Sequence, residues 1–187
     1  MQKKFNKILV ANRGEIAIRI FRACAELGIK SVGIYSKEDK YSLFRTKADE
    51  SYLIGEDKGP IDVYLDMDGI IALAKEKNVD AIHPGYGFLA ENSEFVRKCE
   101  ENGIAFIGPS ADIMDKMGDK INSKKVAHAA DVPTIPGVDK VIETVEEAKK
   151  VADYVGYPVM VKASNGGGGR GRRVVWKRFS AWIRNCL

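Results

Sequence analysis

The chain has 187 residues, 45% of them hydrophobic and 30% charged, a composition typical of one globular domain or of one domain with part of a second. No apolar run approaches the 18 residues that a membrane-spanning helix needs, and residues 1–5 lack the apolar stretch of a secretory signal. Three scattered cysteines, Cys24, Cys99 and Cys186, show no metal-ligand spacing. We therefore expect a cytoplasmic protein with free thiols, no metal site in this chain and no membrane partner.

The net charge of +4 is unevenly distributed along the chain. No acidic residue follows Asp153, and seven of the 30 basic residues lie after it, which leaves 23 basic against 26 acidic residues before that point. Both tryptophans, Trp176 and Trp182, also lie in this last stretch. The composition therefore changes after Asp153, and the basic segment that follows needs a separate explanation.

Over the first hundred or so residues, short apolar runs alternate with segments of helical periodicity. Strands are expected at residues 7–11, 30–35, 51–54, 79–83 and 104–107. Helices are expected between them, after Gly14, at residues 67–77 and at residues 91–102. This repetition predicts an α/β fold, with an open, mostly parallel sheet and helices on both faces.

The first of these helices is amphipathic. Its predicted apolar face consists of Ile16, Ile20, Ala23, Cys24 and Leu27. The opposite face carries Glu15, Arg19, Arg22 and Glu26, in which the pairs 15/19 and 22/26 are oppositely charged at i,i+4. We expect Gly28 to end the helix.

The alternation of predicted strands and helices ends at Pro109. Residues 110–131 are predicted to be helical, in two pieces broken near Gly118. A helix is then expected at residues 143–154, a strand at 158–163, a glycine-rich turn at 165–171 and a return strand at 172–176.

The sharpest chemical signal is a lysine followed by a glycine run. Lys162 ends an apolar strand, and the six residues after Asn165 comprise Gly166, Gly167, Gly168, Gly169, Arg170 and Gly171. Backbone N–H groups of such a loop can converge on a polyphosphate beside the lysine ammonium. A linker or hairpin turn without a ligand is the alternative. The cost of burying an unpartnered lysine favours a phosphate partner.

Two better-known phosphate motifs do not fit. The P-loop pattern GxxxxGK[ST] is excluded, because here the lysine precedes the glycines. The dinucleotide fingerprint GxGxxG belongs directly after the first strand, where this chain has Asn12-Arg13-Gly14-Glu15. An anion can bind at such a strand-to-helix turn, but a supporting role is favoured. His83 is a candidate base, although a structural role is favoured for it too.

Five segments occur together in the order of one family. They are ILVANRGEIA at 8–17, HPGYGFLAEN at 83–92, FIGP at 106–109, MGDK at 117–120 and the lysine–glycine loop. From residue 5 to about 175 the chain resembles the biotin carboxylases. KGPIDVYL at 58–65 is similar to pyruvate carboxylases rather than to free-standing acetyl-CoA carboxylase subunits.

The resemblance implies an ATP-grasp ligase. Such an enzyme uses ATP, Mg²⁺ and bicarbonate to form carboxyphosphate, and it carboxylates the biotin of a carrier domain. In pyruvate carboxylases the carboxyl group then passes to pyruvate, giving oxaloacetate. By this resemblance Lys120 and Lys162 contact ATP and residues 166–171 cover its phosphates. A homodimer is also implied, with Arg19, Arg22 and Glu26 near the interface; a solvated helix face is the alternative.

The resemblance also divides the chain. Residues 1–110 correspond to the N-terminal, pre-ATP-grasp domain, 111–133 to a helical linker and 134–175 to an incomplete ATP-grasp lid subdomain. Residues 176–187 form a basic tail outside the family pattern, interpreted as a truncation scar, with a basic amphipathic segment as the alternative. The family has a methionine where Arg172 stands.

The family's general base, magnesium-binding carboxylates and bicarbonate-holding arginine lie beyond the lid. No catalytic set is therefore complete, and we expect the chain to be inactive alone and to hold no cofactor tightly. Three other readings stay open: an acyl-CoA carboxylase, a Rossmann-type oxidoreductase that the absent GxGxxG disfavours, and a non-enzymatic dimerising or nucleic-acid-binding domain suggested by the basic tail. We expect no nucleic-acid partner, because that basic charge is local.

Overall fold

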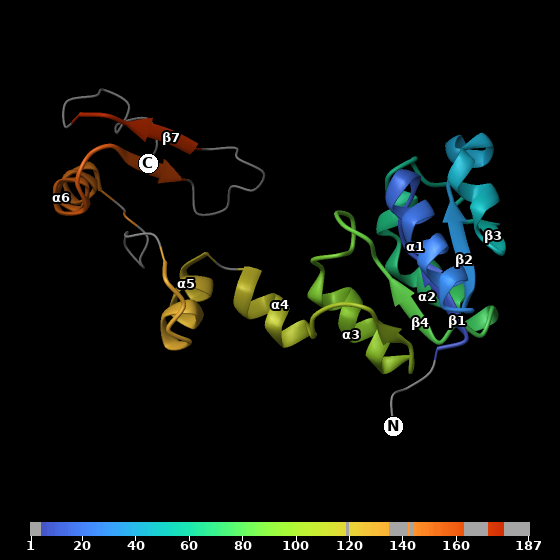
Figure 1. The fold of residues 1–187 in the computed structure, drawn as a ribbon. Coiled ribbons are helices and arrows are strands. Elements are labelled where there is room, and N and C mark those ends of the chain that lie inside the picture. Colours follow the sequence, from blue (N-terminus) through green and yellow to red (C-terminus); the bar gives the residue numbers. More distant parts are fainter. Residues whose placement is uncertain (1–4, 119, 135–141, 143, 163–171, 178–187) are drawn as a thin grey trace. The chain divides into compact units, whose positions relative to one another are not determined.

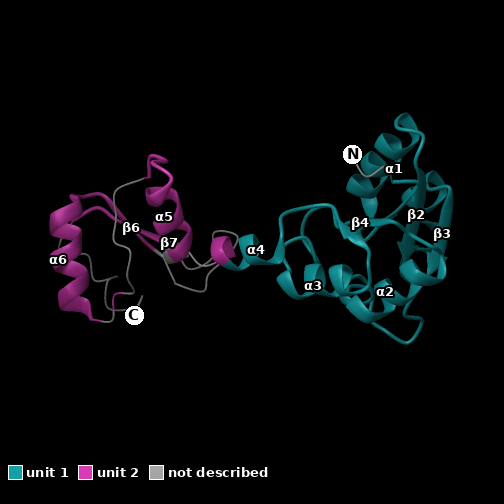
Figure 2. Ribbon diagram, turned by 90° about the horizontal axis from the view of Figure 1, so that it is seen from below, with its two compact units in different colours: residues 1–115 teal, residues 116–187 magenta. Residues whose placement is uncertain are grey.

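The computed structural model describes residues 5–118, 120–134, 142, 144–162 and 172–177, except for the side chains at 120, 121, 162 and 172. The chain divides into two compact units, Met1–Asp115 and Lys116–Leu187, which Figure 2 colours separately.

The first unit contains a five-stranded sheet (Figure 1). Its strands are β1 (Lys7–Val10), β2 (Lys30–Tyr35), β3 (Glu50–Leu53), β4 (Ala81–His83) and β5 (Ala105–Phe106). Their order is β3-β2-β1-β4-β5, and every neighbouring pair is parallel. The predicted α/β class with a parallel sheet is confirmed.

Three helices and three short 3₁₀ turns connect these strands. The helices are α1 (Gly14–Glu26), α2 (Met67–Glu76) and α3 (Ser93–Glu101). The 3₁₀ turns are η1 (Glu38–Tyr41), η2 (Leu43–Lys47) and η3 (Asp62–Leu65). Side chains of Asp66 and Asn92 cap α2 and α3 by accepting hydrogen bonds from the amides of Gly69 and Phe95.

Alternation along the strands gives the sheet two apolar faces. In β1, Leu9 belongs to one buried cluster, whereas Ile8 and Val10 belong to another. Helix α1 supplies Phe21 to the second cluster, and α3 supplies Phe95 to the first. Helices therefore cover both faces, as the sequence predicts.

The predicted face of α1 is partly wrong. Ala23 and Leu27 are exposed, Leu27 at 72%, and the buried residues are Ala17, Ile20, Phe21 and Cys24. These four follow the i, i+3, i+4, i+7 spacing of one helix face. Phe21 packs closely over β2, where a Cβ on Gly33 would lie 3.1 Å from its ring. Leu27 instead caps the helix, and Gly28 follows with a φ of +67°.

The remaining elements begin at the boundary between the units. Helix α4 (Ala111–Gly118) ends where a break is predicted, and α5 (Lys120–Ala129) begins after it. Helix α6 (Val145–Val155) is capped by Thr144, whose hydroxyl accepts from the Glu147 amide. Strands β6 (Val159–Lys162) and β7 (Arg172–Val175) pair antiparallel. The predicted turn at 165–171 lies outside the described residues.

Burial is sparse in the second unit. Among its residues whose side chains the structure describes, Ala152 of α6 and Val175 of β7 are the buried ones. Across the described part of the chain, none of the helices has the length and apolar character needed to cross a bilayer.

Candidate functional site

The first unit has a topological switch point between β1 and β4. These strands are neighbours, but β1 continues through α1 to β2 on one side, whereas β4 continues through α3 to β5 on the other. The loops that follow them separate at the carboxyl edge of the sheet. There a cavity of about 410 Å³ is lined by Asn12, Arg13, Gly14, Glu15, Ile16, Tyr86, Gly87 and Phe88. We refer to it as the switch-point cavity, since ligands of open α/β sheets bind at this position.

Asn12 ties the two loops together. Its side chain is buried, and Nδ2 donates to the carbonyls of Pro84, at 2.7 Å, and Tyr86, at 2.9 Å. Its Oδ1 accepts from the Arg13 amide at 2.8 Å. Gly85 has a φ of +68°, and a Cβ there would lie 2.7 Å from Asn12 Nδ2. The close approach therefore requires glycine at this position.

Asp39 is the centre of a second polar group at the same edge. Its side chain is 4% exposed. It accepts hydrogen bonds from Arg13 Nε (2.7 Å) and Nη2 (2.5 Å), from the Tyr64 hydroxyl (2.6 Å) and from Ser42 Oγ (2.9 Å). Burial alone raises the pKa of the Asp39 carboxyl, but the bonds from Arg13, Tyr64 and Ser42 outweigh burial and hold it below its ordinary value. Asp39 is therefore a charged, fully partnered carboxylate at neutral pH.

Tyr64 links this carboxylate to the loop after β4. Its hydroxyl accepts from the Ser36 amide at 3.2 Å, and its ring stacks on Phe88 with centroids 5.3 Å apart. The Arg13 guanidinium lies 5.8 Å from the same ring centroid. Burial raises the pKa of Tyr64, so its hydroxyl stays protonated and donates to Asp39. The turns after β1, β2 and β4 are thus joined in one network.

His83 shapes the turn that follows β4. Its Nδ1 accepts from the Gly85 amide at 3.0 Å, and burial lowers the pKa of the imidazole. A neutral ring with its proton on Nε2 satisfies this contact. The contact agrees with the structural role favoured from the sequence.

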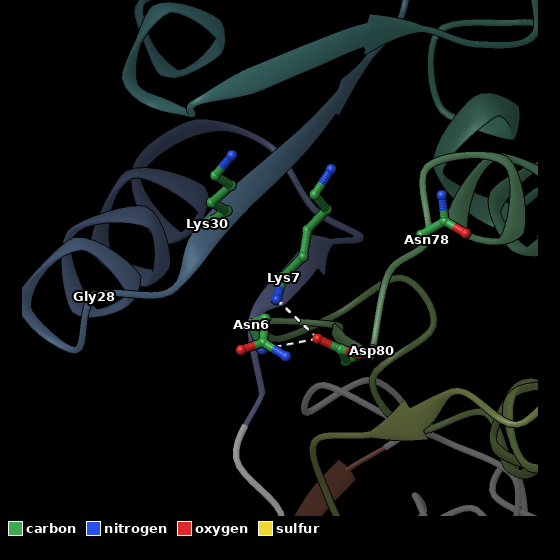
Figure 3. Close-up of a pocket in the computed structure, with 6 residues that line it drawn as sticks. All are labelled: Asn6, Lys7, Gly28, Lys30, Asn78 and Asp80. Atoms are coloured by element: carbon green, nitrogen blue, oxygen red, sulfur yellow. Dashed lines mark hydrogen bonds between the residues drawn. The ribbon is translucent and has the colours of Figure 1, made fainter.

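A second cavity, of about 460 Å³, lies at the opposite, amino edge of the sheet (Figure 3). Its lining residues are Asn6, Lys7, Gly28, Lys30, Asn78 and Asp80. Asp80 accepts the backbone amides of Asn6 and Lys7, at 2.7 and 2.9 Å, and the Lys7 ammonium lies 2.8 Å from Glu50 Oε1. Because Asp80 and Lys7 already have protein partners, we assign this edge a structural role.

The predicted ATP-contacting residues fall in the second unit. Lys120 begins α5 and Lys162 ends β6, and the structure describes their backbones only. The glycines at 166–169, Arg170 and Gly171 lie outside the described residues. The β6–β7 register pairs Lys162 with Arg172, so residues 163–171 connect two neighbouring strand ends. The ATP site stays a prediction.

The residues predicted near a dimer interface form ion pairs along α1. Arg22 Nε lies 2.9 Å from Glu26 Oε1, and Arg19 Nη1 lies 3.6 Å from Glu15 Oε1. All four side chains are more than 60% exposed. The expected i,i+4 pairing is confirmed, and the interface stays a prediction.

The thiols of the described region are inert. Cys24 and Cys99 are both free and buried, and burial raises the pKa of Cys99 to about 12. Within the same region, His, Cys, Asp and Glu side chains form no group of three or more that could hold a metal.

Two known protein families match this chain. Residues 4–114, more than half of the chain, match the biotin carboxylase N-terminal domain, and residues 119–182 match the ATP-binding domain of the carbamoyl-phosphate synthase L chain. The chain belongs to the biotin carboxylase family. The family predicted from the five segments is confirmed.

Two relatives and one solved structure illustrate the match. The chain is 58% identical over 174 residues to the pyruvate carboxylase of Bacillus subtilis (strain 168), and 53% identical over 173 residues to the mitochondrial pyruvate carboxylase of Homo sapiens. These matches cover 93% and 92% of this chain but 15% of each relative's length. The biotin carboxylase domain of Hydrogenobacter thermophilus 2-oxoglutarate carboxylase superposes with a TM-score of 0.88 at 52% identity, covering 98% of this chain and 40% of that one.

Proposed function

We propose that this biotin carboxylase chain is part of a pyruvate carboxylase. In this proposal ATP and bicarbonate give carboxyphosphate, its carboxyl group passes to the biotin of a carrier domain, and pyruvate then accepts it to give oxaloacetate. The 58% identity to the Bacillus subtilis pyruvate carboxylase carries the proposal. The agreement of residues 58–65 with pyruvate carboxylases supports the same subfamily.

Within this function, Lys120, Lys162 and residues 166–171 are assigned to ATP. Two ammonium groups offset phosphate charge, and backbone amides add donors without side-chain obstruction. The antiparallel pairing of β6 with β7 fits this assignment, because Lys162 is the last residue of β6 before the predicted phosphate-binding segment. Mg²⁺ would be held by carboxylates that the family resemblance places after the lid, and it would offset negative charge on the transferred phosphoryl group.

The Hydrogenobacter thermophilus structure supports the proposed ligands. That protein was crystallised as a dimer of biotin carboxylase domains in complex with MgADP, ADP and bicarbonate. By analogy we assign nucleotide, bicarbonate and a second copy of the chain as partners here, with Arg19, Arg22 and Glu26 near the dimer contact. A cytoplasmic location is part of the proposal.

A carboxylase with another acceptor, for which the sequence suggests an acyl-CoA, is the second candidate. The specific observation in its favour is that the Hydrogenobacter thermophilus domain, from a 2-oxoglutarate carboxylase, is 52% identical to this chain. Similar biotin carboxylase domains therefore serve enzymes with different acceptors. The identity of the acceptor must be tested with the carboxyl-transfer part of the enzyme in place.

The test is a chimera in which the matching 174 residues of this chain replace those of the Bacillus subtilis relative. We expect ATP hydrolysis that depends on bicarbonate and Mg²⁺, with carboxylation of free biotin. The 187-residue chain alone, measured in parallel, tests the expected lack of activity. A chimera that folds but hydrolyses no ATP would overturn the proposed function.

A further inference from the structure

The loop that carries Tyr86 has an unusual backbone. Gly85 and Gly87 both have a φ of +68°, and Phe88, which is not glycine, has a φ of +41°. A left-handed conformation at a bulky residue is costly and persists only where its surroundings enforce it. This loop borders the switch-point cavity, and the Tyr86 side chain is largely exposed there. The contacts that enforce the loop therefore determine where the Tyr86 ring lies.

Two buried side chains outside the loop supply those contacts. Asn12 donates to the carbonyls of Pro84 and Tyr86, which fixes the first half of the loop. Asp39 accepts from the Tyr64 hydroxyl, and the Tyr64 ring stacks on Phe88, which fixes the second half. Asp39 also holds Arg13, which lines the same cavity, through two hydrogen bonds.

The geometry points to Asn12 and Asp39 as positioning residues, which place Tyr86 and Arg13 at the rim of the switch-point cavity for the carboxylation reaction. The kinetic part of this inference rests on the proposed function. The structural part does not, because it follows from the hydrogen bonds and the Tyr64–Phe88 ring stacking. Neither side chain needs to touch a substrate to act in this way. A displacement of about 1 Å at a reacting centre is enough to reduce a rate by roughly 100-fold.

Asp49 provides a matched control at the opposite edge of the sheet. Like Asp39, it is a hydrogen-bonded carboxylate: Oδ2 accepts the Ser31 amide and the Ser31 hydroxyl, both at 2.7 Å. Hydrogen bonds from Ser31 lower the pKa of Asp49 below its ordinary value. Asp39→Asn and Asp49→Asn therefore make the same chemical change in two networks, and only one of these networks reaches the loop after β4.

The first experiment is ¹⁹F NMR of the 187-residue chain labelled with 3-fluorotyrosine. Tyr86→Phe assigns the Tyr86 signal, and the exposed Tyr154 of the second unit serves as an internal reference. We expect Asn12→Ala and Asp39→Asn to shift or broaden the Tyr86 signal, and Asp49→Asn to leave it unchanged. Tyr64→Phe, which keeps the ring but removes its hydroxyl, should give a smaller change and serves if the other variants do not fold. An unmoved Tyr86 signal in folded Asp39→Asn and Asn12→Ala would overturn the inference.

The second experiment measures carboxylation of free biotin by the same variants in the chimera. We expect kcat/KM to fall by about 10- to 100-fold in Asn12→Ala and Asp39→Asn, and to stay within about twofold in Asp49→Asn, whose carboxylate is more exposed. Equal kcat/KM in Asp39→Asn and Asp49→Asn would contradict the positioning role. An inactive unsubstituted chimera would instead reject the proposed function, and the NMR result would still decide whether the two residues hold Tyr86.

Discussion

The two units of the chain differ in how much apolar surface they bury for themselves. In Met1–Asp115, buried side chains form clusters on both faces of a parallel sheet. In Lys116–Leu187, Ala152 and Val175 are the buried residues among the side chains that the structure describes, whereas Met160 and Val174 are exposed cross-strand partners. The residues that the sequence assigns to ATP lie in this sparsely packed unit. The densely packed core and the residues proposed to bind ATP thus occupy different parts of the chain.

The largest expected effect tests the packing of the first unit. Phe95 is fully buried and meets Phe106 edge to face, with ring centroids 6.1 Å apart. Phe95→Ala should lower the unfolding free energy by about 3–5 kcal/mol, through lost burial and the cavity left behind. Urea denaturation followed by circular dichroism measures this loss. A change below about 1 kcal/mol would show that the packing described for this face is wrong.

A smaller effect is expected for the buried carboxylate at the carboxyl edge. Asp39→Asn should cost about 1–3 kcal/mol at neutral pH, because Arg13 loses its charged partner. Since folding lowers the pKa of Asp39, its contribution is full above the ordinary aspartate value of about 3.9 and disappears as pH falls through the folded-state pKa. The stabilities of the two proteins, measured from pH 7 to pH 2, should therefore converge in acid. A constant difference would contradict the assignment.

Val175→Ala probes the second unit at its buried strand position. We expect a loss of about 1–2 kcal/mol, smaller than that for Phe95→Ala, because fewer neighbours surround the deleted methyl groups. Hydrogen exchange should accelerate at the amides of β6 and β7 and stay unchanged in the five-stranded sheet. Acceleration in both units would mean that they unfold together, and the contrast between them would not hold.

The smallest effect concerns the ion pairs on α1. Arg22→Ala should change the unfolding free energy of the chain by about 0.2–0.5 kcal/mol, since Arg22 and Glu26 are exposed. If Arg22 lies at a dimer contact, the same substitution should also weaken self-association in sedimentation velocity. Thr46→Ala, which removes the bond from an exposed hydroxyl to the Leu43 carbonyl, is the comparison variant.

Local patterns predicted the elements of both units well. The apolar run at 30–35 coincides with β2, and the break near Gly118 coincides with the end of α4. The buried face of α1 was harder to predict, because the predicted and the observed apolar faces share Ile20 and Cys24. Packing of Phe21 against Gly33 selects the observed face. A local pattern carries no information about that contact.

The network at the carboxyl edge was not predictable from local patterns. Asp39 lies 26 residues from Arg13 and 25 from Tyr64, in turns that look like ordinary polar loops. Its burial becomes visible only when the sheet order brings those turns together. Asn12 was noted in its motif, but its bonds to the carbonyls of Pro84 and Tyr86 depend on the pairing of β1 with β4.

The most direct test of the account is the replacement of Lys162 by methionine in the chimera. Lys150→Met, on the exposed surface of α6, is the matched control. If Lys162 holds nucleotide phosphates, bicarbonate-dependent ATP hydrolysis should fall by about 100-fold or more, as for a lost charge at a phosphoryl group, while Lys150→Met retains the rate of the unsubstituted chimera. ATP hydrolysis that is equal in the two variants would contradict the assignment of this unit to ATP.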